Sequence, residues 1–207
     1  MRKTIILLLT LISGLPALAE GLWGAKASLD FNVPGKWHVD DFSTELYRSG
    51  LGFSLGGVYS RYFNDNVFLE PSLSFFYDTY SCDFIINEHS DITPGVYKVG
   101  LRLPLVVGYT FDITDEFSLS VFTGPELDYA FAGGYRIKDK SFDDDLGPLL
   151  GSDGVQHSLS CAWKGGIGFP FSAWRVDFEA ALGLTDIIRH SPSCKENRFS
   201  ISLLRYF

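Results

Sequence analysis

The segment 96–111 reads VYKVGLRLPLVVGYTF and alternates two kinds of side chain along its whole length. Its odd-numbered positions are all apolar, with a tyrosine near either end. Its even-numbered positions are mostly small or charged, among them Lys98, Gly100, Arg102 and Gly108. A period of two predicts a β-strand with two unlike faces. The uncharged apolar face fits a strand that meets lipid on the outside and a narrow polar lumen on the inside.

The same alternation recurs along the chain and predicts an all-β fold. We expect one eight-stranded antiparallel transmembrane β-barrel, an up-and-down meander, with strands at 21–32, 50–63, 67–80, 96–111, 117–131, 158–171, 174–187 and 198–207. The connections alternate between long and short, beginning with a long one. Transmembrane barrels show this asymmetry, with short periplasmic turns and long outer loops. The N-terminus is therefore expected on the short-turn side.

The polar face separates this prediction from a soluble barrel with an apolar interior. It is rich in glycine and serine, for example Gly52, Ser54, Gly56, Ser72 and Ser74. A face in water would more often have long charged side chains, whereas small residues suit the cramped interior of an eight-stranded barrel. The high hydrophobic content of 46% and the mean hydropathy of +0.10 agree with a wall that exposes apolar surface to lipid.

Charges of both signs lie on the same inward face. The expected inward residues are Lys26, Lys98, Arg102, Lys164, Arg175 and Arg198, with Asp30, Glu70, Asp78, Glu126, Asp128, Asp177 and Glu179. A buried charge costs several kcal/mol unless it is paired. We therefore predict a salt-bridge network that fills the lumen. The alternative is the lining of a selective channel.

The N-terminus has the pattern of a secretory signal peptide. Arg2 and Lys3 precede an apolar stretch, and the small-residue motif Ala17-Leu18-Ala19 places cleavage before Glu20. The chain is thus divided into a signal peptide, 1–19, and an outer-membrane β-barrel domain, 20–207. The formal charge of −8 does not favour nucleic acid as a partner.

Four prolines fall inside the expected strands: Pro71, Pro104, Pro125 and Pro170. Each removes one donor from the backbone ladder, and a closed barrel has no free edge. We expect bulges or strand ends near some of them.

Several motifs in order resemble the PorT-type outer-membrane β-barrel family of bacteria. They are Leu103-Pro104-Leu105, Tyr109-Thr110-Phe111, Gly124-Pro125, Gly183-Leu184-Thr185-Asp186 and the final segment from Arg198 to Leu203. The resemblance implies an eight-stranded barrel in the bacterial outer membrane and no shared catalytic residues. The aromatic C-terminus, Phe207, is of the kind that the barrel-insertion machinery reads. Arg205, which shares the outward face of this strand, departs from the pattern and is expected to reach lipid head groups.

Few residues suggest chemistry. All four histidines, His38, His89, His157 and His190, fall in expected loops, and a catalytic pair needs a nucleophile within hydrogen-bond reach. Asp143-Asp144-Asp145 with Asp153 matches no calcium-loop spacing and is expected to be a solvated loop. We therefore predict no catalytic, cofactor-binding or metal-binding residues.

The three cysteines follow export into an oxidising space. Cys161 is expected on the lipid face. Cys82 and Cys194 lie in different outer loops, so a disulfide between them stays open at this stage.

The sequence therefore predicts a non-enzymatic outer-membrane protein with a side-chain-filled lumen. Its expected partners are outer-membrane lipid and, at the outer loops, an envelope protein or a glycan. The longest of these loops is 132–156. The alternatives are a lipid-modifying enzyme of the lipid A deacylase or acyltransferase type, and a small porin.

Overall fold

The computed structural model describes residues 21–35, 37–39, 42–44, 47–82, 95–114, 117–136, 148–151, 154–188 and 194–207. The predicted signal peptide, 1–19, lies outside these residues. No helix in the described part of the chain is long and apolar enough to cross a membrane.

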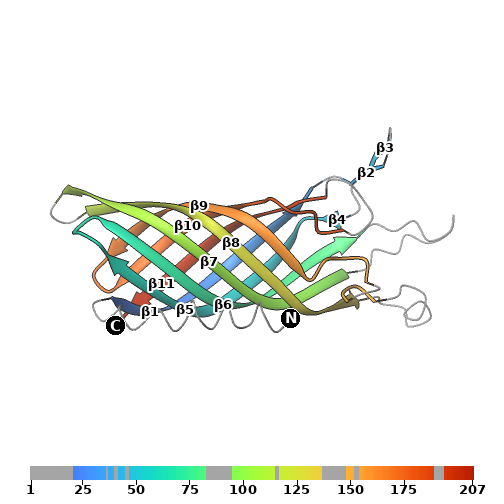
Figure 1. Ribbon diagram of the computed structural model, residues 1–207, viewed down its shortest axis with the longest axis horizontal. Helices are drawn as coiled ribbons and strands as arrows, with labels where there is room; N and C mark the ends of the chain where they lie inside the picture. Colours follow the sequence, from blue (N-terminus) through green and yellow to red (C-terminus); the bar gives the residue numbers. More distant parts are fainter. Residues whose placement is uncertain are drawn as a thin grey trace, which may run out of the picture.

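Eight long strands of the described chain form a closed antiparallel barrel (Figure 1). They are β1 (Leu22–Pro34), β5 (Gly50–Tyr62), β6 (Val67–Cys82), β7 (Gly95–Thr114), β8 (Phe117–Arg136), β9 (Leu159–Phe171), β10 (Trp174–Gly183) and β11 (Glu196–Tyr206). Each pairs with its neighbours in the chain, and β11 closes the ring by pairing with β1 from Pro34↔Glu196 to Gly24↔Tyr206. The predicted fold and strand order are confirmed.

Three short strands lie at the end with the long connections. β2 (Trp37–Val39) and β3 (Phe42–Thr44) form a separate hairpin that extends beyond the barrel in Figure 1. β4 (Tyr47–Arg48) pairs with the end of β6 and leads into β5. We call this end the outer mouth and the opposite one the short-turn end.

The alternation of side chains along each strand is the physical basis of the barrel. In β1, every second residue from Gly24 to Asn32 is buried, and the residues between them are exposed. Apolar side chains, among them Leu29, Leu51, Leu55 and Ile201, are therefore exposed on the outer wall. Polar and charged side chains point into the lumen, as expected for a wall that faces lipid.

Tight turns join the strands at the short-turn end. The Asn64 side chain accepts hydrogen bonds from the backbone N–H groups of Asn66 and Val67, at 3.0 and 2.6 Å. At the turn between β9 and β10, Ser172 has a φ of 56°, and the Ala173 carbonyl accepts a hydrogen bond from Tyr206 N. Two of the expected short connections are therefore tight turns, and Tyr206 fixes the last strand to one of them.

One predicted strand end is wrong, and the prediction of bulges or strand ends near some of the prolines is met only by Pro170. The strand expected to run to Ile187 ends at Gly183, because the N–H groups of Leu184 and Thr185 donate to Cys161 O and the chain then turns over the lumen. The register is the same on both sides of Pro71, Pro104 and Pro125, so they cause no bulges. The register shifts between β7 and β8 lie instead at Val99/Gly100 and Asp112/Thr114, whereas Pro170 does lie near a strand end.

Candidate functional site

The lumen contains most of the charged side chains that the structure buries. It holds Lys26, Lys98, Arg102, Lys164, Arg175 and Arg198, together with Asp30, Glu70, Asp78, Glu126, Asp128, Asp177, Glu179 and Glu196. These side chains come from seven of the eight barrel strands, all but β5, and are arranged in layers along the barrel. Because buried charges must be paired, the layers are best described by their ion pairs.

Arg175 is the centre of the layer nearest the short-turn end. Its guanidinium donates to both carboxylate oxygens of Glu70, at 2.6 and 3.0 Å, and to both of Asp177, at 2.8 and 3.0 Å. Three rings surround it, those of Phe68, Phe122 and Tyr206, and the Tyr206 hydroxyl donates to Glu70. The planar fork of arginine suits two carboxylates at once, and the rings exclude water from the pairs.

Glu179 is the centre of the next layer. It accepts from Lys26 at 2.6 Å and forms an ion pair with Lys164 at 3.0 Å. Ser202 also donates to Glu179, and its hydroxyl is 2.8 Å from that of Ser28. Small hydroxyl side chains thus occupy the space that remains between the charged ones.

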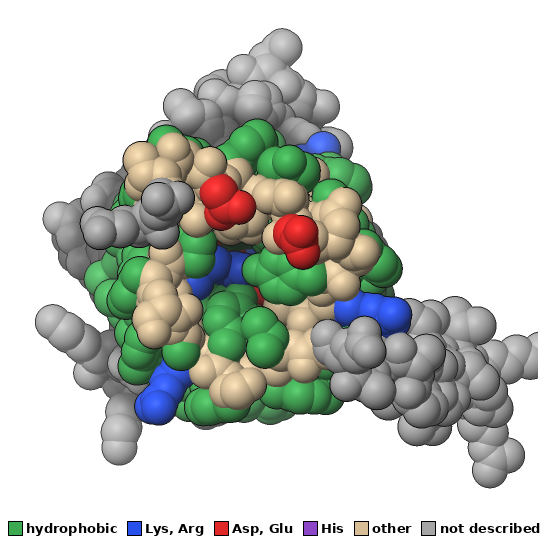
Figure 2. All heavy atoms as spheres, turned by 90° about the vertical axis from the view of Figure 1, so that its left-hand side faces the viewer, with side chains coloured by type: hydrophobic (Ala, Val, Ile, Leu, Met, Phe, Trp, Pro, Cys, Tyr) green, Lys and Arg blue, Asp and Glu red, His purple; other side chains and the backbone are tan. Residues whose placement is uncertain are grey.

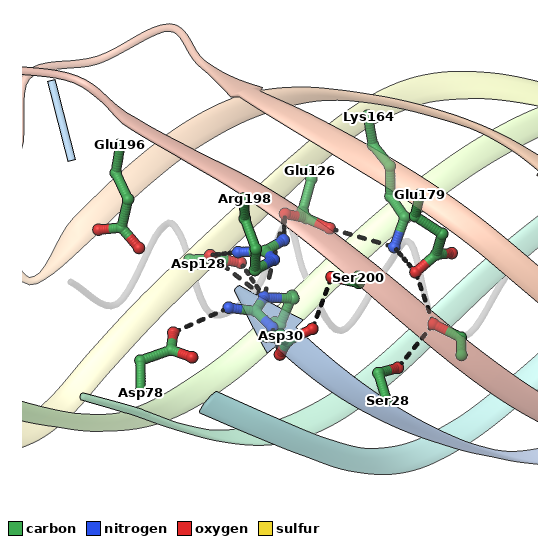
Figure 3. Close-up of polar contacts among 12 residues, drawn as sticks. Ser28, Asp30, Asp78, Glu126, Asp128, Lys164, Glu179, Glu196, Arg198 and Ser200 are labelled. Atoms are coloured by element: carbon green, nitrogen blue, oxygen red, sulfur yellow. Dashed lines mark hydrogen bonds and ion pairs between the residues drawn. The ribbon is translucent and has the colours of Figure 1, made fainter. Parts of the chain in front are cut away.

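Two arginines hold four carboxylates in the layer beyond it (Figure 3). Arg102 donates to Asp30 at 2.8 Å, Asp78 at 3.0 Å and Asp128 at 3.2 Å. Arg198 donates to Asp128 and to Glu126. Glu126 also lies 3.5 Å from Lys164, which links this layer to the previous one.

An apolar cluster covers the polar layers at the outer mouth. Lys98 donates to Glu196 at 2.6 Å, and the Tyr80 hydroxyl donates to the same carboxylate. Above them lies the cap, which we define as the buried cluster Tyr80, Val96, Leu149, Ile187, Ile188 and Cys194. The hydrogen bonds from Gln156 N to Leu149 O and from His157 N to Ile187 O hold two segments of the cap together.

The spaces left inside the described barrel are small. Three internal cavities lined by charged and polar groups of the layers each hold about 10 Å³, room for about one water molecule. Figure 2 views the short-turn end, where hydrophobic and polar side chains surround an opening with basic side-chain atoms deep inside it. Side chains therefore fill most of the lumen that the described residues enclose.

The predicted inward charges are confirmed in position. The six basic and seven acidic side chains expected on the polar face all point into the lumen, and they form the network. One member, Glu196, was missed because it precedes the alternating run that predicted the last strand. The Pro34↔Glu196 pair shows that β11 already begins there.

The other candidate residues are not brought together. His157 is exposed beside the cap, and its imidazole makes no hydrogen bond with another described residue. His89, His190, Asp143-Asp144-Asp145 and Asp153 lie outside the described residues. Among the described residues, no group of three His, Cys, Asp or Glu side chains is arranged to hold a metal ion.

Cys194 is a free, fully buried thiol, so the open question of a disulfide with Cys82 is answered against it in this structure. Its Sγ donates to Gly35 O at 3.4 Å. Burial raises the pKa of this thiol to about 11, so it stays protonated at neutral pH. Cys194 therefore packs as a small apolar side chain of the cap.

Several solved structures of bacterial outer-membrane proteins are similar to this barrel. The solved structure of the outer membrane protein OprG from Pseudomonas aeruginosa is similar with a TM-score of 0.51 and 11% identity, over 90% of this chain and 95% of that one. Ail, the attachment invasion locus protein of Yersinia pestis, gives a TM-score of 0.44 and 15% identity over 91% and 99%. The outer membrane enzyme PagL gives 0.46 and 14% over 87% and 98%.

No curated protein sequence matches the chain. A family model described as "Outer membrane protein beta-barrel domain" matches residues 23–189, which include seven of the eight barrel strands. The apolar outer wall and the polar, filled lumen agree with that description. The chain therefore belongs to the outer membrane protein beta-barrel domain family, and its place is the bacterial outer membrane.

Proposed function

We propose that the protein is a non-enzymatic outer-membrane barrel that presents a binding surface at its outer mouth. The observation that carries the proposal is the filled lumen. Its ion pairs and its cap leave internal cavities of only about 10 Å³ each. Such a filled lumen favours a barrel that serves as a rigid scaffold over one that transports a solute. Specific binding then belongs to the segments beyond the barrel, because rigid scaffolds usually carry function on their loops.

The described side chains at the outer mouth support the same proposal. His157 lines one of the small cavities together with Ser158 and Ser160, yet its imidazole makes no hydrogen bond with a serine hydroxyl of the described residues. A catalytic pair requires a nucleophile within hydrogen-bond reach of the base. The order of the proline and glycine motifs supports a finer assignment within the family, to the PorT-type group.

The surface that we assign to binding includes the described part of the longest connection, residues 148–151 and 154–156. Val155 is exposed there, while Leu149 and Gln156 beside it are buried and fix its position. The expected partner is an envelope protein or a glycan. Its contacts would form around Val155 while the barrel beneath stays unchanged.

In-cell photo-cross-linking tests the proposal. A benzophenone amino acid at Val155 should capture a discrete partner, whereas the same probe at Phe63, an exposed side chain at the short-turn end, should not capture it. A second probe is placed at Gly151, on the same connection. Identical adducts from Val155 and Phe63, or no adduct from either Val155 or Gly151, would contradict binding at the outer mouth. A change in lipid A acyl chains that is lost in the His157→Ala variant would instead support the enzyme.

A further inference from the structure

The outer wall of the barrel contains one large apolar groove. It crosses β1, β5, β9, β10 and β11 and has a volume of about 670 Å³, within the range of about 300–1,000 Å³ that is usual for small-molecule sites. Gly165 and Ala180 lie side by side on its floor. Its sides are apolar and mostly large: Leu29, Phe31, Ile167, Phe178, Phe199 and Ile201.

The groove results from the sizes of outward-facing side chains in two neighbouring rows, where a row consists of residues paired across adjacent strands. One row is large throughout, since Ile167 pairs with Phe178 and Phe178 pairs with Ile201. The next row begins with Gly165 and Ala180 and becomes large only at Phe199. Short side chains on β9 and β10 therefore form the floor of the groove, and the large side chains around them form its sides.

The position of the groove selects its occupant. Leu29, Phe178 and Ile201 lie near the middle of their strands, at the depth of the hydrocarbon core rather than of the head groups. Three polar residues, Asp30, Glu179 and Ser200, also line the groove, but their side chains are hydrogen-bonded within the lumen network. The floor residues Gly165 and Ala180 pair within the β-ladders, so the groove offers a ligand mainly apolar contacts. The groove is also continuous with the outer wall, whose neighbour in the outer membrane is lipid.

We propose that this groove binds one acyl chain of an outer-membrane lipid and exchanges it more slowly than the rest of the wall does. A chain on a smooth wall touches protein on one side only, whereas a chain in the groove also touches the rings of Phe178 and Phe199. Dispersion contacts add up with the number of neighbouring atoms. This proposal requires only that the barrel lies in the outer membrane, and it is independent of the proposed binding at the outer mouth.

Native mass spectrometry of the full barrel tests this inference. The folded protein in detergent micelles is incubated with dipalmitoyl phosphatidylglycerol, and the lipid retained by the protein ion is measured. The wild type should retain one lipid. Gly165→Leu should lower the retained fraction about tenfold, which is the effect of excluding about two methylene groups from contact.

Gly57→Leu is the matched control. Gly57 is also a glycine of the outer wall, outside the groove. A Cβ at Gly165 would meet nothing closer than 3.7 Å, and one at Gly57 nothing closer than 3.9 Å, so both variants should fold. If Gly165→Leu fails to fold, Phe199→Ala removes one side of the groove without adding volume, and it should lower retention in the same way.

Equal retention by the wild type, Gly165→Leu and Phe199→Ala would overturn the proposal, as would no retained lipid in the wild type. A dimer that dissociates in Gly165→Leu, without a change in lipid, would also overturn it, because the occupant would then be a second copy of the chain.

Discussion

Arg175 is the residue whose loss the barrel should tolerate least. Its side chain pairs with two carboxylates and lies among three rings. Arg175→Met leaves Glu70 and Asp177 buried next to each other without their cation. Removing one partner of a buried ion pair costs about 3–5 kcal/mol, so the free energy of unfolding in urea should fall by about that amount.

Arg205 provides the matched control at the residue scale. It lies on the outer wall over the rings of Trp174 and Phe207, at 5.3 and 5.9 Å, and makes no ion pair with a described residue. An exposed cation–π contact is worth about 0.5–1 kcal/mol. Arg205→Met should therefore lower the free energy of unfolding by that smaller amount. Equal losses in the two variants would show that the buried pairs of Arg175 carry no special stability.

At the scale of elements, the alternation predicted which residues point inward but not which of them meet. Lys26 and Glu179 both follow from the period of two, and yet they are far apart in the sequence. Their contact depends on the closure of β11 on β1, which places β10 close to β1. The register between strands is set by backbone pairing around the whole ring, and a single strand contains no information on it.

The ends of the elements were predicted least well, also for a physical reason. The strand expected to end at residue 131 continues to Arg136, although Gly133 and Gly134 have no side chains that alternate. They pair with Lys98 and Tyr97 of β7, because a ladder uses backbone groups and needs no side-chain pattern. In β10 the opposite occurs, since Ile187 and Ile188 are apolar enough to continue the strand but bury themselves in the cap.

The last strand is the element for which we expect a role in assembly. Phe207 is 74% exposed, and its N–H donates to Trp23 O at the seam between β1 and β11. Phe207→Ala should slow insertion into the outer membrane several-fold if the insertion machinery reads this side chain. The loss in free energy of unfolding should stay below about 1 kcal/mol, because exposed side chains contribute little.

Pulse-chase labelling measures this rate through the shift in gel migration between unboiled and boiled samples. Phe63→Ala is the control, because Phe63 is an exposed aromatic residue at the same end that does not belong to the last strand. Equal delays in both variants would assign the effect to the aromatic rim in general.

At the scale of the whole molecule, two seals lie in series along the lumen. The apolar cap closes the outer mouth, and the ion-paired layers fill the barrel from Glu196 to Arg175. An ion crossing the barrel needs a continuous path of water, and the internal cavities each hold about one molecule. The wild type in a planar bilayer should therefore show no steady conductance.

The two seals can be separated by loosening only the cap. A Leu149→Ser, Ile187→Ser double variant puts hydroxyl groups into the cap and leaves every ion pair in place. It should also show no steady conductance, because the arginines that hold Asp30, Glu70 and Asp128 still fill the lumen beneath. Conductance in this variant alone would identify the cap as the only effective seal. Steady, ion-selective conductance in the wild type would mean that the layers rearrange in the membrane, and it would favour the small porin.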